Sequence, residues 1–158
     1  MSVGAYILLN KLDSAEILQQ KVIKLYQDYG YQQAAILSSR TLIHLYVESS
    51  DRLSEAKPLM DKFESEYDKF DENHNLPPSE RQYFYYKGRY YEKTGRLDSA
   101  ELYYRKMYKP DMSPTSLDPL YRGLFNVFTK RNQPDSIAKY AQLFCEANDS
   151  SVTRKDQE

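Results

Sequence analysis

A short phrase occurs twice in this chain, and the repetition constrains the fold more than any other feature of the sequence. Residues 12–18 read LDSAEIL, and residues 97–103 read LDSAELY. Weaker copies are LSEA at 53–56 and PDSI at 134–137. If Ala15, Ala56, Ala100 and Ile137 are equivalent, the copies are 41, 44 and 37 residues apart. Repeated helix pairs at this period indicate a solenoid, because one pair cannot bury its own apolar face.

The apolar residues between these copies recur at intervals of three and four, which is the period of a helix. Leu18, Val22 and Leu25 form one such series, and no window alternates convincingly as a strand. Gly30 and Gly95 each follow an apolar run, so we expect them to end helices. The chain is therefore predicted to be all-α, with about eight helices of roughly 10–18 residues.

Capping patterns predict where several helices begin. Asp13 and Asp98 each have a Glu three residues later, and Ser79 has a Gln three residues later. These spacings are typical of a capping box, in which two side chains satisfy the free amides of the first turn. Asp118 followed by Pro119 predicts a further helix start, with the proline at its first position.

Composition excludes several classes of function. The 158 residues carry 22 basic and 23 acidic side chains, so the near-zero charge argues against a dedicated nucleic-acid binder. One cysteine and two histidines cannot form a disulfide framework or a closed zinc site. No apolar stretch reaches the length of a membrane span, and no phosphate-binding loop or catalytic motif occurs. We therefore expect that the chain is not an enzyme, that it holds no cofactor and no metal ion, and that this segment does not insert into a membrane.

One segment resembles a known repeat family. Residues 84–107 are similar to a tetratricopeptide (TPR) repeat at six helix-packing positions: Phe84, Gly88, Tyr91, Ala100, Tyr104 and Met107. A second match follows, with Phe125 where the family has glycine. The resemblance implies a superhelical solenoid of about four antiparallel helix pairs over 1–147. The units would span approximately 1–29, 31–70, 79–109 and 117–147, followed by a polar tail at 148–158.

The resemblance also implies a binding surface. In TPR proteins the first helices of successive pairs line a concave groove. The residues that line this groove form the exposed stripe of each first helix. The corresponding positions in this chain are Tyr85, Arg89, Glu92, Lys93, Arg122, Asn126 and Lys130. Such a basic groove would suit an acidic peptide or a C-terminal carboxylate. The alternative is an ordinary solvated helix face.

Tyrosine is unusually frequent, and eight of the 16 tyrosines lie between Tyr83 and Tyr108. They are interpreted either as repeat packing or as an aromatic binding surface. Adjacent helical residues point about 100° apart, so doublets such as Tyr85–Tyr86 and Tyr90–Tyr91 cannot place every ring in one core.

The preferred hypothesis is a non-catalytic module that binds a protein or peptide on its concave face. A second hypothesis comes from residues 135–150, which resemble the last TPR unit before the membrane helix of Bacteroidetes envelope signalling proteins. The chain would then be a periplasmic sensory segment of a membrane-anchored regulator; otherwise it would be cytoplasmic. A third hypothesis is a self-assembling structural array in which exposed tyrosines form a homodimer face.

Overall fold

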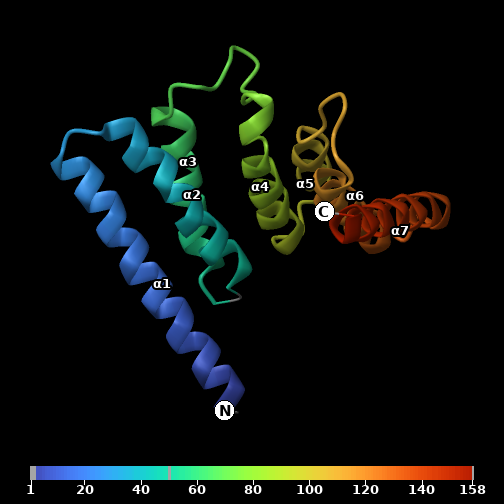
Figure 1. Ribbon diagram of the computed structural model, residues 1–158, viewed down its shortest axis with the longest axis horizontal. Coiled ribbons are helices and arrows are strands. Elements are labelled where there is room, and N and C mark those ends of the chain that lie inside the picture. The colour runs from blue at the N-terminus through green and yellow to red at the C-terminus, as the bar shows by residue number, and fades with distance from the viewer. Residues whose placement is uncertain (1–2, 50, 158) are drawn as a thin grey trace. The chain divides into compact units, whose positions relative to one another are not determined.

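The computed structural model describes residues 3–49 and 51–157, and over these ranges it contains helices and connecting turns but no strand (Figure 1). The α-helices are α1 (Val3–Asp28), α2 (Gln32–Glu48), α3 (Leu53–Glu66), α4 (Gln82–Lys93), α5 (Leu97–Arg105), α6 (Pro114–Lys130) and α7 (Pro134–Gln157). A short 3₁₀ helix, η1 (Pro78–Glu80), precedes α4. The all-α prediction is confirmed.

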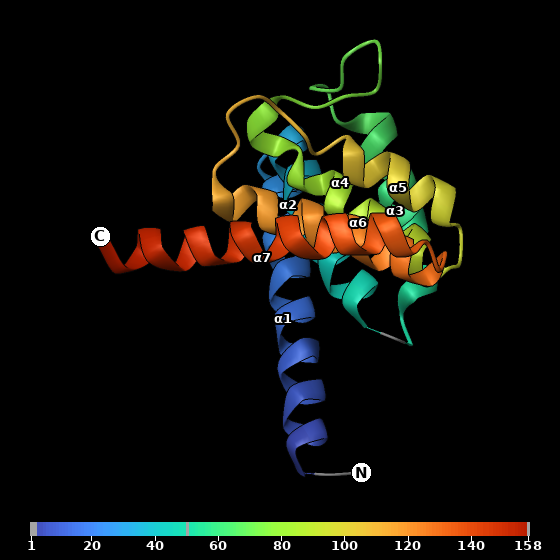
Figure 2. The same ribbon diagram turned by 90° about the vertical axis from the view of Figure 1, so that its right-hand side faces the viewer.

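The chain divides into two compact units, Met1–Phe70 and Asp71–Glu158. In the first unit α2 packs against both α1 and α3. In the second unit α5 packs against both α4 and α6, α4 also touches α6, and α6 packs along α7. Figure 2 shows α1 and α7 as uninterrupted helices. Residues 148–157, predicted as a polar tail, therefore continue α7.

Three helix–helix turns share one geometry. Gly30, Gly95 and Asn132 have φ angles of 81°, 82° and 56°, in the left-handed region that glycine and asparagine adopt most readily. In each turn the backbone amide of the following residue donates a hydrogen bond to the carbonyl oxygen five residues before it. The bonds run from Tyr31 to Tyr26, from Arg96 to Tyr91 and from Gln133 to Phe128, at 2.8, 2.9 and 3.2 Å. This is the Schellman motif, which satisfies the last carbonyls of a helix. The predicted helix ends at Gly30 and Gly95 are confirmed.

The shared turn corrects the register of the sequence repeat. Five residues after Gly30 and Gly95 lie Ala35 and Ala100, both buried at the start of the second helix. Ala35 is therefore the structural equivalent of Ala100, whereas Ala15 is exposed in the middle of α1. The predicted equivalence of Ala15 is wrong.

The helix start predicted at Asp13 is also wrong, because α1 continues through it. No glycine or proline occurs between Gly4 and Gly30, so nothing ends the helix before this capping pattern. The first predicted unit is thus one helix instead of a pair, and seven α-helices are seen over the described ranges where about eight were expected.

A second predicted start lies inside a helix as well. α6 begins at Pro114, and the Ser113 side chain accepts a hydrogen bond from the Ser116 amide at 3.3 Å. Asp118 and Pro119 are therefore interior residues of α6. The serine–proline pair supplies the cap and the preset φ angle that were expected from the aspartate and proline five residues later.

The core of the second unit is organised around one tyrosine ring. Tyr104 of α5 is fully buried, and a Cβ atom built on Gly88 would lie 2.6 Å from its ring carbons. A Cβ on Gly123 of α6 would lie 2.7 Å from the same ring. The two glycines therefore let α4 and α6 both approach α5 closely. The six residues of the predicted packing signature are all buried.

Candidate peptide-binding face

The predicted binding residues come from two helices that touch each other. Tyr85, Arg89, Glu92 and Lys93 lie on α4, whereas Arg122, Asn126 and Lys130 lie on α6. Because α4 and α6 are in contact, the C-terminal turns of both helices bring part of this set together. We call the surface formed by these residues the α4/α6 face.

Glu92 is a buried member of this set, with only 4% of its surface exposed. Its position four residues after Gly88 places it on the side of α4 that faces Tyr104. The Tyr104 hydroxyl donates a 2.9 Å hydrogen bond to Glu92 Oε1. The prediction of Glu92 as an exposed groove residue is therefore wrong, and its carboxylate is part of the core.

Two cations from neighbouring helices meet at the other oxygen of Glu92. Arg89 Nη1 lies 3.1 Å from Oε2, and Lys130 Nζ lies 2.9 Å from the same atom. The Arg89 side chain is 20% exposed and the Lys130 side chain 47% exposed. Burial raises the pKa of Tyr104, and the nearby Glu92 charge adds to that rise. The hydroxyl therefore stays protonated and holds Glu92 in place.

The remaining predicted residues lie apart from this cluster. Arg122 bonds Asp118 within α6 at 2.9 Å, and its guanidinium lies 5.3 Å from the centre of the Phe144 ring of α7. Eight residues separate Arg122 from Lys130, which is about 12 Å along a helix. The predicted basic groove is thus divided into the Arg89–Lys130 pair at one end and Arg122 at the other.

Tyr85 and Asn126 are both half-buried on this face. The Tyr85 ring lies 5.9 Å from the Tyr104 ring, so one side of it packs against the core. Lys93, in the last turn of α4, is also half-buried. Part of each side chain therefore remains accessible from outside.

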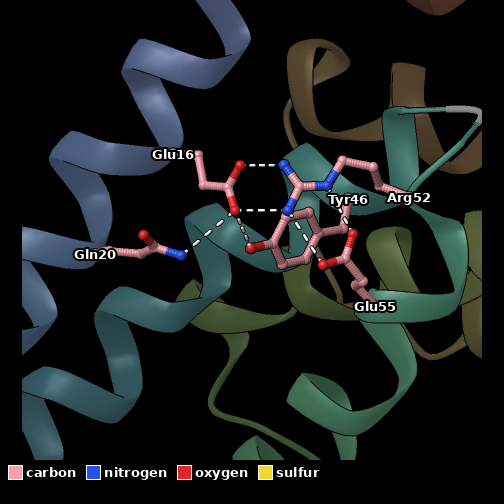
Figure 3. Close-up of polar contacts among 5 residues, drawn as sticks. All are labelled: Glu16, Gln20, Tyr46, Arg52 and Glu55. Atoms are coloured by element: carbon pink, nitrogen blue, oxygen red, sulfur yellow. Dashed lines mark hydrogen bonds and ion pairs between the residues drawn. The ribbon is translucent and has the colours of Figure 1, made fainter.

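A polar cluster in the first unit was not predicted (Figure 3). The Arg52 guanidinium, just before α3, donates to both oxygens of Glu16 on α1, with Nη2 2.6 Å from Oε1. The Tyr46 hydroxyl of α2 donates to the same carboxylate at 2.7 Å. Arg52 also bonds Glu55, and Gln20 reaches Glu16 at 3.4 Å. The cluster joins residues from all three helices of the unit.

The electrostatics of this cluster favour the ion pair. Hydrogen bonds from Arg52, and then from Tyr46, lower the pKa of Glu16. Burial, followed by the hydrogen bond to Glu16, raises the pKa of Tyr46 to about 12. A bidentate arginine–carboxylate pair is a strong, oriented contact, so the cluster acts as a clamp between helices. Sequence reasoning assigned Glu16 to a cap, and no spacing rule links it to Arg52, 36 residues away.

The first unit also contains an open groove of about 320 Å³ between α1 and α3. Ile23, Leu42 and Phe63 contribute apolar surface from α1, α2 and α3 respectively, and Lys24, Lys62 and Glu66 line it as well. No motif of the sequence predicted this groove.

No protein-family model, no curated protein and no solved structure matches this chain. Among the residues that the structure describes, no helix combines the length and apolar character needed to span a membrane. Within the same part of the chain, no three or more His, Cys, Asp or Glu side chains gather in a way that could hold a metal ion.

Proposed function

We propose that this chain is a non-catalytic, TPR-like module that binds an acidic peptide segment on its α4/α6 face. The observation that carries the proposal is the Arg89–Lys130 pair. Two cations from successive first helices are held at fixed positions by one buried carboxylate, while nearly half of the Lys130 side chain stays accessible.

The architecture of the second unit supports this proposal. α4 and α6 lie against each other, and α5 packs against both through the Tyr104 ring. This is the arrangement that a TPR-like array requires, with first helices adjacent and a second helix behind them. The binding surface therefore stands on helices whose spacing is fixed by close packing around Gly88 and Gly123.

The chemistry of the pair suits a carboxylate ligand. A lysine ammonium has three donors, and Lys130 uses one of them on Glu92. A peptide carboxylate placed above Lys130 would receive a charge-assisted hydrogen bond from a group that is already oriented. Tyr85 would add apolar contact beside it, because its accessible edge combines a large area with few rotatable bonds.

Fluorescence polarisation with a labelled peptide tests this proposal. The probe is a short peptide alternating Tyr with Asp and Glu, and the comparison peptide carries Lys at every acidic position. We expect the acidic probe to bind and Lys130→Met to weaken binding by about tenfold, which corresponds to about 1.4 kcal/mol.

Lys139→Met is the matched control, because Lys139 is an exposed lysine of the same unit on α7. It removes the same charge and should change affinity less than about twofold. Equal weakening by both variants would show that only net charge matters. Binding unaffected by Lys130→Met would place the site elsewhere.

A further inference from the structure

α1 carries a second apolar stripe that, among the residues that the structure describes, no other helix of its own unit covers. The residues facing α2 include Glu16 and Gln19, whose side chains bond Tyr46 and the Ser38 carbonyl. About 100° around the helix, apolar residues recur at alternating intervals of three and four, the spacing of a coiled-coil seam. This outer seam consists of Ala15, Leu18, Val22, Leu25 and Tyr29.

The outer seam is strongly exposed. Leu18, Leu25 and Tyr29 have 64%, 57% and 72% of their surfaces accessible, and Val22 is half-buried between them. Side chains of this size each present on the order of 100 Å² or more at such exposure. A contiguous apolar stripe of several hundred Å² on one helix is typical of a protein contact surface.

We propose that the outer seam pairs with the same seam of a second copy, in antiparallel orientation. A two-fold axis between Val22 and Leu25 would place Val22 of one copy opposite Leu25 of the other. Leu18 would then lie opposite Tyr29 of the second copy. Each contact occurs twice, because the two-fold symmetry makes the interface self-complementary.

Charge complementarity argues for this occupant and this orientation. Lys21 directly precedes Val22 of the seam, and Asp28 directly precedes Tyr29, seven residues later. Both charged residues therefore lie along the same edge of the seam, and both are exposed. In the antiparallel register, Lys21 of each copy lies within about one turn of Asp28 of the other copy, which forms two ion pairs. A parallel pairing would bring Lys21 beside the edge formed by Gln19 and Tyr26, where it meets no carboxylate.

The size of the seam sets the expected strength of the dimer. The paired segment spans residues 18–29, about 18 Å of helix on each copy. Its total buried area falls near or below about 1,200 Å², which is characteristic of weak, reversible association. The dimer should therefore form at micromolar concentrations and be sensitive to salt. This inference is independent of the peptide-binding proposal, which concerns the other unit.

Sedimentation equilibrium of the full chain, from about 1 to about 500 µM, tests the proposal. For the wild-type chain we expect the mass to rise from 18.6 kDa toward twice that value. Lys21→Asp alone, or Asp28→Lys alone, places like charges opposite each other and should weaken the dimer at least about tenfold. The double variant, with both substitutions, restores opposite charges and should recover wild-type association.

Circular dichroism provides the control that each variant keeps its helix content. A wild-type chain that stays monomeric across the range would overturn the proposal and leave the seam to a helix of another protein. The antiparallel register would be overturned if the single charge reversals left the strength of association unchanged, or if the double variant did not recover wild-type association.

Discussion

Replacing Gly88 by alanine tests the close packing on which the α4/α6 face depends. The added methyl carbon would lie 2.6 Å from two carbons of the Tyr104 ring. The ring cannot move away, because Gly123 of α6 packs against it. A Cβ atom built on Gly123 would lie 2.7 Å from the same ring. Tyr104 itself is completely buried.

Two opposing effects determine the size of the change. In an open helix, glycine to alanine stabilises by about 1 kcal/mol, because alanine restricts the unfolded chain. Overpacking a filled core costs about 1–3 kcal/mol, and a ring confined on both sides falls at the upper end. The net expectation for Gly88→Ala is a loss of about 2 kcal/mol. With a urea m-value of about 2 kcal/mol/M, the unfolding midpoint should fall by about 1 M.

Urea unfolding followed by near-ultraviolet circular dichroism of tyrosine measures this shift. The control is the same substitution in a Tyr104→Leu background, where the smaller side chain leaves room for the methyl group. There Gly88→Ala should be neutral or stabilising, which gives a coupling energy of about 2 kcal/mol or more between the two positions. If Gly88→Ala left the stability of its parent unchanged in both backgrounds, the packing argument would be refuted.

Substitutions at three further positions test other parts of the structure. Tyr104→Phe should cost about 1–3 kcal/mol in thermal unfolding, because it leaves a buried oxygen of Glu92 without its hydroxyl donor; an unchanged midpoint would contradict that role. Gly95→Asn should cost less than Gly95→Ala in the same assay, because φ is 82° there and asparagine tolerates this region better. Arg52 lowers the pKa of Glu16, so the stability from this pair is present above the ordinary carboxyl pKa and lost as pH falls through the lowered value. Glu16→Gln should therefore be less stable than wild type near neutral pH, and the difference in urea midpoint should shrink in acid; a constant difference would count against the ion pair.

Local signals predicted much of the fold. Periodicity identified the helices, and Gly30 and Gly95 marked helix ends because a left-handed residue at that position is a local requirement. Capping patterns were less reliable. Asp13 sits in a helix that nothing interrupts, and Asp118 follows a stronger start at Ser113.

Long-range contacts were harder to predict. The close contact of Gly123 on α6 with the Tyr104 ring was not predicted, because the repeat pattern has its glycine position in this unit at Phe125. Glu92 looked like a groove residue because a family stripe was carried over without the contact to Tyr104. The Glu16–Arg52 pair joins segments 36 residues apart, and only the packing of the helices brings them together.

We propose that the Arg89–Lys130 pair receives a carboxylate on the α4/α6 face. The most direct measurement is side-chain NMR of both cations during titration with the acidic peptide. We expect saturable shifts of the Lys130 ε-methylene and Arg89 Nε–H signals, with the same dissociation constant that fluorescence polarisation gives. Lys139 signals should stay unchanged. Saturable binding that leaves the Lys130 and Arg89 signals unmoved would show that the peptide carboxylate binds elsewhere.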